Sequence, residues 1–375
     1  MTTSPASAKP VKSVRPTKGL RHIHALDGVR GTAYLLVLGH HCFATELPPG
    51  PWPALDRAFI NFWSFGYLGV DLFFVLSGYL ITTLLLLDRR GPHYFRNFYV
   101  KRAFRILPIF LVVIAIVWSM HMVSTSYALL SLFFIVTFAQ LLHVRSYGPF
   151  WSLAIEEQFY LFWPLIVRRF NMRRLRQILW LVILIEPVIR YFFVRGGHSI
   201  SYYTFTRCDG LAWGALLAME SRLHRLLEGG VRAVSWWKNK GIFVFATGCI
   251  LAVVGVILSF YPAGGRWDTA VMLSACPLLF SGLLGFILTH RKSWISKIFR
   301  NPVLRFYGDI SYGSYLVHLY VLAGYDRVVA PYPAGATGPW ILRGAVICIV
   351  TTITCTVSLH FFERPIMNLR KRLLA

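Results

Sequence analysis

Long apolar stretches alternate with short basic clusters along this sequence, and no other feature constrains its fold as strongly. About twenty apolar residues in a helix are enough to cross the hydrocarbon core of a membrane. With 56% hydrophobic and only 14% charged residues, the chain has more apolar surface than a soluble domain can bury. We therefore expect an all-α polytopic membrane protein. The clear apolar stretches cover residues 26–46, 62–87, 106–123, 151–167, 177–194, 204–219, 242–261, 269–289, 306–325 and 339–361.

The basic residues predict how often the chain crosses the membrane. Lys and Arg gather in six clusters, which lie at 9–21, 89–105, 168–176, 220–241, 291–305 and 364–372. With ten crossings, all six clusters lie on the cytoplasmic side, as the positive-inside rule requires. A further apolar stretch, 127–143, would add an eleventh crossing and divide the clusters between both sides. We therefore expect about ten transmembrane helices, both termini in the cytoplasm, and 127–143 re-entrant or on the outer face.

The same pattern sets the domain organisation and excludes some functions. We expect a disordered basic cytoplasmic tail at 1–25, a transmembrane domain at 26–363 and a basic cytoplasmic tail at 364–375. The net charge of +24 comes from basic clusters between apolar stretches, as membrane topology and anionic headgroups require. Nucleic acid is therefore not an expected partner. The six cysteines stand singly in or beside apolar stretches, so no metal site is expected.

Arg30 and His41 lie in the first apolar stretch, eleven residues apart. In a helix this spacing puts both side chains on one face, roughly 16 Å apart along the axis. Asp27 lies about one turn before Arg30 on nearly the same face. Polar groups on one stripe of a buried helix are costly and indicate a polar path inside a bundle. A structural alternative stays open here: Arg30 reaches the membrane interface, and His41 is a hydrogen-bonded core residue.

Asp71 and Ser77 lie in the second apolar stretch, within the segment 69–81, which also contains two glycines. A carboxylate at this depth needs a partner, and the stripe formed by Arg30 and His41 could supply one. Helix packing with a capping Asp71 is the alternative. The glycines allow close approach of another helix or of a ligand.

Lys101, Arg102 and Arg105 form a basic group just before the third stretch. Arg102 and Arg105 are three residues apart and share a helical face. Guanidinium groups bind phosphate in a bidentate manner, so this pair suits a phosphate ligand at a pocket mouth. Anchoring at the cytoplasmic interface explains the same residues without a ligand.

Glu156 and Glu157 open the fourth stretch among aromatic residues that include Tyr160. Adjacent helical residues point about 100° apart, so at most one of the two carboxylates shares a buried face. A carboxylate beside aromatic rings is suited to acid–base chemistry or to positioning a hydroxyl acceptor.

The remaining polar residues of the apolar stretches have simpler structural explanations. Arg207 and Asp209 lie at an outer helix end, where pairing with each other is the simplest arrangement. Glu186 and Arg190 are four residues apart and fit a structural ion pair. Later stretches add Tyr312, His318 and Glu363.

Together these motifs resemble the membrane-bound acyltransferase-3 family. The family's Arg and His, separated by ten residues, are similar to Arg30 and His41, and this match selects His41 instead of His40. Lys101 stands where the family commonly has Arg. The other matching segments are 69–81, 102–108, 151–160, 207–210, 310–318 and 362–365.

The resemblance implies an enzyme that transfers an acyl group, with acetyl expected, from cytoplasmic acyl-CoA to a hydroxyl of a sugar, polysaccharide or related acceptor. It implies catalytic roles for His41, Arg30, Asp71 and Glu156. Acyl-CoA, as co-substrate, would be held by Arg30, Lys101, Arg102 and Arg105, without a metal. The structural or acceptor-side positions would be Asp27, Ser77, Tyr160, Arg207, Asp209, Tyr312, His318 and Glu363.

The resemblance also implies a multi-pass protein of the bacterial inner membrane, in contact with its lipids and with polysaccharide-assembly proteins. Because the sequence stops soon after Arg364, we expect the stand-alone form without an esterase-like domain. A proton-coupled transporter or flippase, with His41, Asp71 and Glu156 as a proton relay, is the rival hypothesis, followed by a non-catalytic scaffold. The acceptor, the acyl chain length, the oligomeric state and the choice between direct transfer and an acyl-histidine stay open.

Overall fold

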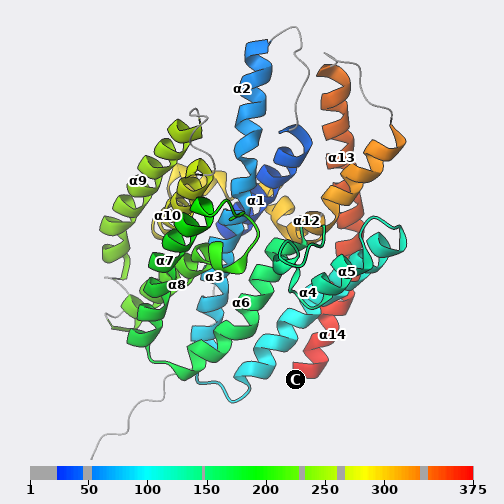
Figure 1. Cartoon of the computed structure of the whole chain (residues 1–375). Helices are drawn as coiled ribbons and strands as arrows, with labels where there is room; N and C mark the ends of the chain where they lie inside the picture. The colour runs from blue at the N-terminus through cyan, green and yellow to red at the C-terminus, as the bar shows by residue number, and fades with distance from the viewer. Residues whose placement is uncertain are drawn as a thin grey trace, which may run out of the picture.

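The computed structural model describes residues 23–44, 53–145, 148–227, 233–259, 267–329 and 337–374, and within these residues the chain is helical and contains no strand (Figure 1). The long helices are α1 (His24–Phe43), α3 (Gly69–Asp88), α4 (Tyr94–Ser119), α6 (Phe150–Arg169), α7 (Met172–Arg195), α8 (Asp209–Leu227), α9 (Ala233–Ser259), α10 (Trp267–Thr289), α12 (Pro302–Val328) and α13 (Thr337–Ser358). The shorter elements are α2 (Pro53–Ser64), η1 (Phe65–Leu68), α5 (Thr125–Leu132), η2 (Val136–Phe138), η3 (Thr204–Thr206), α11 (Trp294–Ile298), the π-helical turn η5 (Leu359–Glu363) and α14 (Arg364–Leu374).

Each of the ten apolar stretches expected to cross the membrane contains one long helix. Five helical segments of the described chain are long and apolar enough to cross a membrane by length and composition, namely Leu55–Asp88, Met172–Arg195, Gly241–Ser259, Trp267–Thr289 and Gly338–Arg370. The all-helical, membrane-spanning class is therefore confirmed. The count of ten crossings and the side of each terminus stay predictions.

The stretch 127–143 does not form a long helix. Its short helix α5 ends at Leu132, and Phe134 follows with a left-handed φ of 55°. His143 takes a similar left-handed φ of 53°, beyond the short turn η2. A non-glycine residue in this region breaks a right-handed helix. The segment is therefore not an eleventh membrane-spanning helix.

Two pairs of helices cross with their backbones in close contact, and both crossings depend on glycine. Where α1 meets α12, a Cβ atom on Gly31 would overlap the backbone carbonyl of Leu304. Where α3 meets α8, a Cβ atom on Gly78 would overlap the backbone carbonyl of Leu211. Small residues at such crossings let helices approach closely inside a membrane. The close helix contact expected at the glycines of 69–81 is therefore present.

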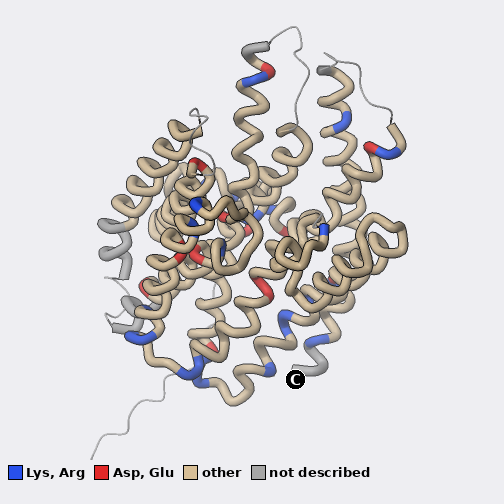
Figure 2. Tube along the Cα trace, viewed as in Figure 1, with Lys and Arg blue, Asp and Glu red and all other residues tan. Residues whose placement is uncertain are grey.

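The two ends of the bundle differ in chemistry. Figure 2 shows a group of Lys and Arg at the end where α6 passes into α7 and where α14 is found. The opposite end holds an aromatic cluster from α1, α2 and α13, in which the rings of Phe43, Phe59, Trp63 and Trp340 have neighbouring centroids 5.1–6.2 Å apart. Aromatic rings gather at membrane–water interfaces. The bundle therefore has one basic end and one aromatic end.

The predicted terminal tails differ in what the structure describes. Residues 1–22 lie outside the described residues, and α1 begins within the rest of the predicted N-terminal tail, at His24. Residues 364–374, predicted as a basic tail, form the helix α14, which packs on α4. The C-terminal basic residues are therefore part of the helical bundle.

Candidate active site

Helix α1 carries Arg30 and His41, the first two predicted site residues. It is one unbroken helix from His24 to Phe43, so Arg30 and His41 have the spacing of roughly 16 Å expected from the helical rise. The carboxylate of Asp27 lies close enough to Arg30 for their opposite charges to interact. The close crossing at Gly31 holds this helix against α12, which brings residues of the last third of the chain to its face.

Four arginines from three helices gather near the basic end of the bundle. Arg102 and Arg105 of α4 lie within electrostatic reach of Arg30, and Arg370 of α14 lies within reach of Arg105. Arg30 and Arg102 are half-buried, and Arg105 is exposed. Because like charges repel, such a group is suited to an anionic ligand that enters from solvent. Lys101 is exposed on the same helix.

Glu156 accepts hydrogen bonds from two of the predicted site residues. Ser77 of α3 donates to one carboxylate oxygen at 2.9 Å, and Tyr160 of α6 donates to the other at 3.0 Å. The guanidinium of Arg102 lies over the Tyr160 ring, 5.1 Å from its centroid. Glu156 also lies within electrostatic reach of Arg30. The structure therefore joins the predicted carboxylate to the predicted arginine group.

A small cavity of about 60 Å³ extends from Glu156 toward α12. Its volume matches roughly two water molecules at liquid density. Tyr312, one of its walls, donates a hydrogen bond to the Ile106 carbonyl at 3.0 Å. The Tyr315 hydroxyl lies 2.5 Å from the Ser152 hydroxyl across the cavity. The lining residues are Val70, Phe73, Phe74, Ser152, Leu153, Glu156, Ser311, Tyr312, Tyr315 and Leu316.

Beyond Tyr315, the structure brings together two histidines that are far apart in the sequence. The Tyr315 ring lies 5.6 Å from the His318 ring, and the His318 ring lies 5.1 Å from the His41 ring. His318 is 1% exposed, whereas His41 is half-buried. Contacts therefore link the two groups: Glu156, near the arginines, and Tyr315, which packs against the histidine pair, both line the cavity.

The hydrogen bonds of His318 determine which of its nitrogens carries the proton. Its Nδ1 lies 2.8 Å from the Tyr315 carbonyl and 3.2 Å from the Ser314 carbonyl. Since a carbonyl oxygen can only accept, Nδ1 must donate, and a neutral ring then leaves Nε2 as an acceptor. Within the described part of the chain, Nε2 is buried and makes no hydrogen bond. His318 is thus a buried acceptor beside His41.

His40 provides a comparison within the same helix. Its ring also lies 5.1 Å from the His41 ring, but its Nδ1 lies 3.1 Å from the Trp63 carbonyl and its ring packs against Tyr67. His41 is the histidine that packs against His318.

The predicted partner of Asp71 was wrong. Asp71 pairs with Arg207 at 3.2 Å, and not with the Arg30–His41 stripe. The Arg207 guanidinium also lies over the rings of Trp151 and Phe74, 5.5 and 5.8 Å from their centroids. Asp71 and Arg207 are 3% and 4% exposed, so each neutralises a charge that could not otherwise stay buried.

The pairing of Arg207 with Asp209 was wrong as well. Asp209 pairs instead with Arg190 of α7 at 2.7 Å. Arg190 also pairs with Glu186 at 3.1 Å, which confirms that predicted ion pair. Glu363, in η5, accepts a hydrogen bond from Ser358 at 3.1 Å.

The family model for the acyltransferase domain Acyl_transf_3 matches residues 23–360. The chain belongs to the acyltransferase-3 family. It is therefore an enzyme that transfers acyl groups other than aminoacyl groups, as the motifs predicted, and a multi-pass membrane protein. The transporter and scaffold hypotheses find no support in this match.

Curated relatives of the chain include proteins named as peptidoglycan O-acetyltransferases. A Bacillus subtilis (strain 168) protein named "Putative peptidoglycan O-acetyltransferase YrhL" is 32% identical over 93% of the chain and 56% of its own length. A Listeria monocytogenes protein named "Peptidoglycan O-acetyltransferase OatA" is 29% identical over 92% of the chain and 56% of its own length. The chain spans just over half the length of these curated relatives. No solved structure matches it.

Sequence reasoning missed three residues of this acyltransferase site. Tyr315 is three residues before His318, and this helical spacing could have placed both on one face. Ser152 lies in the matching segment 151–160, as Tyr315 lies in 310–318, but neither was singled out. Arg370 carried no comparable signal, because its place depends on how α14 packs against other helices.

Proposed function

We propose that this protein transfers an acetyl group from acetyl-CoA to a hydroxyl of a glycan, with peptidoglycan as the first candidate acceptor. The relatives' printed names support the acceptor class. We place the protein in the bacterial cytoplasmic membrane, with residues 26–363 as the catalytic domain and with polysaccharide-assembly proteins as partners.

One observation carries this proposal: the arginine group and the histidine pair lie at the two ends of one continuous arrangement. Arg30 and Arg102 lie near Glu156, and Arg105 lies near both arginines. The cavity beside Glu156 is lined by Tyr315, whose ring packs against His318. A donor with a highly charged end and a long uncharged arm matches the order of these parts, because charge binds at one end and chemistry occurs at the other. The cavity of about 60 Å³ would have to widen to admit the arm.

The arginine group would bind the phosphates of acetyl-CoA. Arg30, Arg102 and Arg370 supply half-buried guanidinium groups, while the exposed Arg105 and Lys101 add further positive charge. Guanidinium groups match phosphate oxygens in pairs, which favours this ligand. If the basic end faces the cytoplasm, as the positive-inside rule predicts, the donor is bound from the compartment that contains it.

Glu156 would hold this donor site together and would not act on the acceptor. Both of its oxygens are engaged, by Ser77 and by Tyr160. Its charge lies among the arginines, so it offsets their mutual repulsion when no ligand is bound. Asp71 would likewise act indirectly, because it holds the Arg207 guanidinium over the ring of Trp151.

His41 would act as the general base of the transfer. It takes the proton of the acceptor hydroxyl, the oxygen attacks the thioester carbonyl, and the carbon–sulfur bond breaks. The proton then passes from His41 to the departing thiolate, so that free CoA and the ester are the products. His318 would accept a hydrogen bond from the far nitrogen of His41 and so keep the near nitrogen unprotonated, since its own Nε2 is an unused acceptor.

The experiment measures acetyl transfer by the purified protein in lipid vesicles, with acetyl-CoA and a peptidoglycan fragment. We expect His41→Ala to lower kcat by about 100-fold or more, because general-base catalysis contributes about 10²–10⁴. We expect Arg30→Ala to raise KM for acetyl-CoA. Arg173→Ala, at an exposed position of the basic end outside the arginine group, is the control and should match the wild type.

Two outcomes would contradict the proposal. One is a folded His41→Ala variant with near-normal turnover. The other is a wild-type protein whose thermal stability does not rise with CoA, since a bound ligand stabilises the folded state and a transporter has no reason to bind this one.

A further inference from the structure

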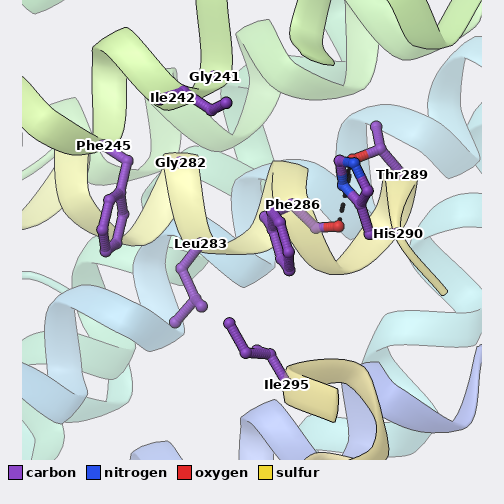
Figure 3. A pocket seen from close by; sticks show the side chains of 9 residues that line it. All are labelled: Gly241, Ile242, Phe245, Gly282, Leu283, Phe286, Thr289, His290 and Ile295. Carbon is purple, nitrogen blue, oxygen red and sulfur yellow. Dashed lines mark hydrogen bonds between the residues drawn. The ribbon is translucent and has the colours of Figure 1, made fainter. Parts of the chain in front are cut away.

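A second and larger cavity lies between α9, α10 and α11, and it has no part in the proposed transfer. Its volume is about 240 Å³. An engineered apolar cavity of about 150 Å³ is already large enough to bind benzene. Figure 3 shows the side chains of Phe245, Leu283, Phe286 and Ile295 around a common space, with Thr289 and His290 at one end. The other lining residues are Gly241, Ile242 and Gly282.

The walls of this cavity favour hydrocarbon over water. Its middle is lined by phenyl and aliphatic side chains. The Thr289 hydroxyl donates to the Gly285 carbonyl at 2.9 Å and also lies 2.9 Å from Nδ1 of His290. The His290 ring stacks on Phe286, with centroids 4.4 Å apart. A buried water needs two to four polar partners, and these groups already bond to each other.

The cavity opens on the outer surface of the bundle. Ile242 is 65% exposed and Phe245 is 38% exposed. On α9, the exposed apolar surface continues through Ile250, Val253 and Ile257. In a membrane protein, such a surface faces the acyl chains of lipids. The hydrocarbon nearest to this cavity is therefore that of the bilayer.

Cationic residues follow directly from the polar end of the cavity. Helix α10 ends at Thr289, and His290, Arg291 and Lys292 come next, with Arg291 and Lys292 exposed. Lys297 of α11 is exposed as well. These residues come directly after His290, which lines the cavity. Basic residues at a membrane interface attract anionic headgroups.

We propose that this cavity holds one acyl chain of an anionic phospholipid, whose headgroup lies against Arg291 and Lys292. The order of the parts matches the order in the lipid: an apolar groove, a polar rim at Thr289 and His290, and then cationic side chains. The site is separate from the arginine group and the histidine pair, so the proposal does not rest on the proposed function.

Photolabelling of the full-length protein in phosphatidylcholine vesicles tests the proposal. One probe is phosphatidylglycerol with a photoreactive group in its acyl chain, and the other is phosphatidylcholine with the same chain. We expect the anionic probe to label 241–245 and 282–286 several-fold more than the neutral probe does. The double variant Arg291→Gln/Lys292→Gln should remove this preference, and Leu283→Trp, which fills the cavity, should lower labelling by both probes.

The double variant Arg173→Gln/Arg174→Gln is the matched control, because both residues are exposed at the basic end but start α7 instead. It should keep the preference. The proposal is overturned if both probes label the groove equally in the wild type, if the control loses the preference too, or if the lipid-facing residues Leu181 and Leu184 of α7 are labelled as strongly as the groove. Thermal unfolding of each variant shows whether it is folded.

Discussion

At the scale of single residues, His41 has two histidine neighbours at the same ring distance that differ in how deeply they are buried. His40 and His318 both lie with ring centroids 5.1 Å from His41. The buried Nε2 of His318 has no hydrogen bond within the described residues, whereas His40 is half-buried and bonds to Trp63 through Nδ1. Both rings donate through Nδ1 to a carbonyl and leave Nε2 as an acceptor, but only His318 of the two is fully buried, which keeps its acceptor away from water.

Replacing His318 tests this difference. We expect His318→Phe to lower kcat by roughly 10- to 100-fold with little change in KM for acetyl-CoA, because losing an orienting partner of a catalytic histidine costs about that much. His318→Gln, whose amide oxygen can accept a hydrogen bond, should recover part of the loss. Steady-state kinetics in vesicles gives both constants.

His40→Phe is the control and should keep nearly normal kinetics. If His318→Phe and His40→Phe reduce kcat alike, or if His318→Phe loses only thermal stability, His318 does not orient His41.

The ion pair of Asp71 and Arg207 gives a prediction about stability. Asp71→Ala leaves the Arg207 charge buried without a partner, which costs about 3–5 kcal/mol. The double variant Asp71→Leu/Arg207→Met removes both charges and should recover most of this loss. Thermal unfolding in detergent measures the three proteins, and a double variant less stable than Asp71→Ala would refute the account.

The residue types of the site were predictable from the sequence, but their partners were not. Arg30, Glu156 and Tyr160 could be selected because polar groups are costly in apolar helices. The partner of Asp71 is 136 residues away, and no helical spacing relates the two. Pairs within one helix, such as Glu186 and Arg190, were predictable because four residues make about one turn.

At the scale of elements, the crossing of α1 and α12 places the histidine pair. A side chain on Gly31 would collide with the backbone of α12 at Leu304, which cannot move aside as a side chain can. A Cβ atom on Gly324, in the same α12, would meet no atom within 4 Å. Gly31 is therefore the position to test, and Gly324 is its control.

We expect Gly31→Leu to abolish the folded protein or separate α1 from α12, with loss of activity. Gly324→Ala should be neutral or stabilise the helix by about 1 kcal/mol or less, since alanine is the better helix former. Size-exclusion profiles, thermal unfolding and activity compare the two. A stable and active Gly31→Leu would mean that the helices do not pack as described.

Helix positions were predictable at this scale, and irregular segments were not. Ten apolar stretches contain ten long helices because a continuous apolar run has few other ways to satisfy its backbone. The helix breaks at Phe134 and His143 could not be predicted, because no Gly or Pro lies at either position. Likewise, the basic composition of 364–375 predicted a cytoplasmic tail without assigned structure. Residues 364–374 instead form a helix, and this helix packs on α4.

At the scale of the whole molecule, the separation of a basic end from an aromatic end predicts the orientation. We expect a membrane-impermeant maleimide to label R57C in intact cells, and R291C only after the membrane is opened. Both positions are exposed, and three of the native cysteines are buried. The unsubstituted protein is the blank, and equal labelling of both variants in intact cells would contradict the predicted topology.

The continuous helix formed by α2, η1 and α3 has a consequence for the surrounding bilayer. Its 34 residues from Leu55 to Asp88 extend roughly 50 Å, whereas a hydrocarbon core is about 30 Å thick. Arg89 and Arg90 follow its basic end, so the excess length falls at α2, where Leu55, Phe59 and Phe62 are exposed. A thicker bilayer covers these side chains and a thinner one leaves them in water. We therefore expect the stability of the protein to depend on the thickness of its membrane through this helix.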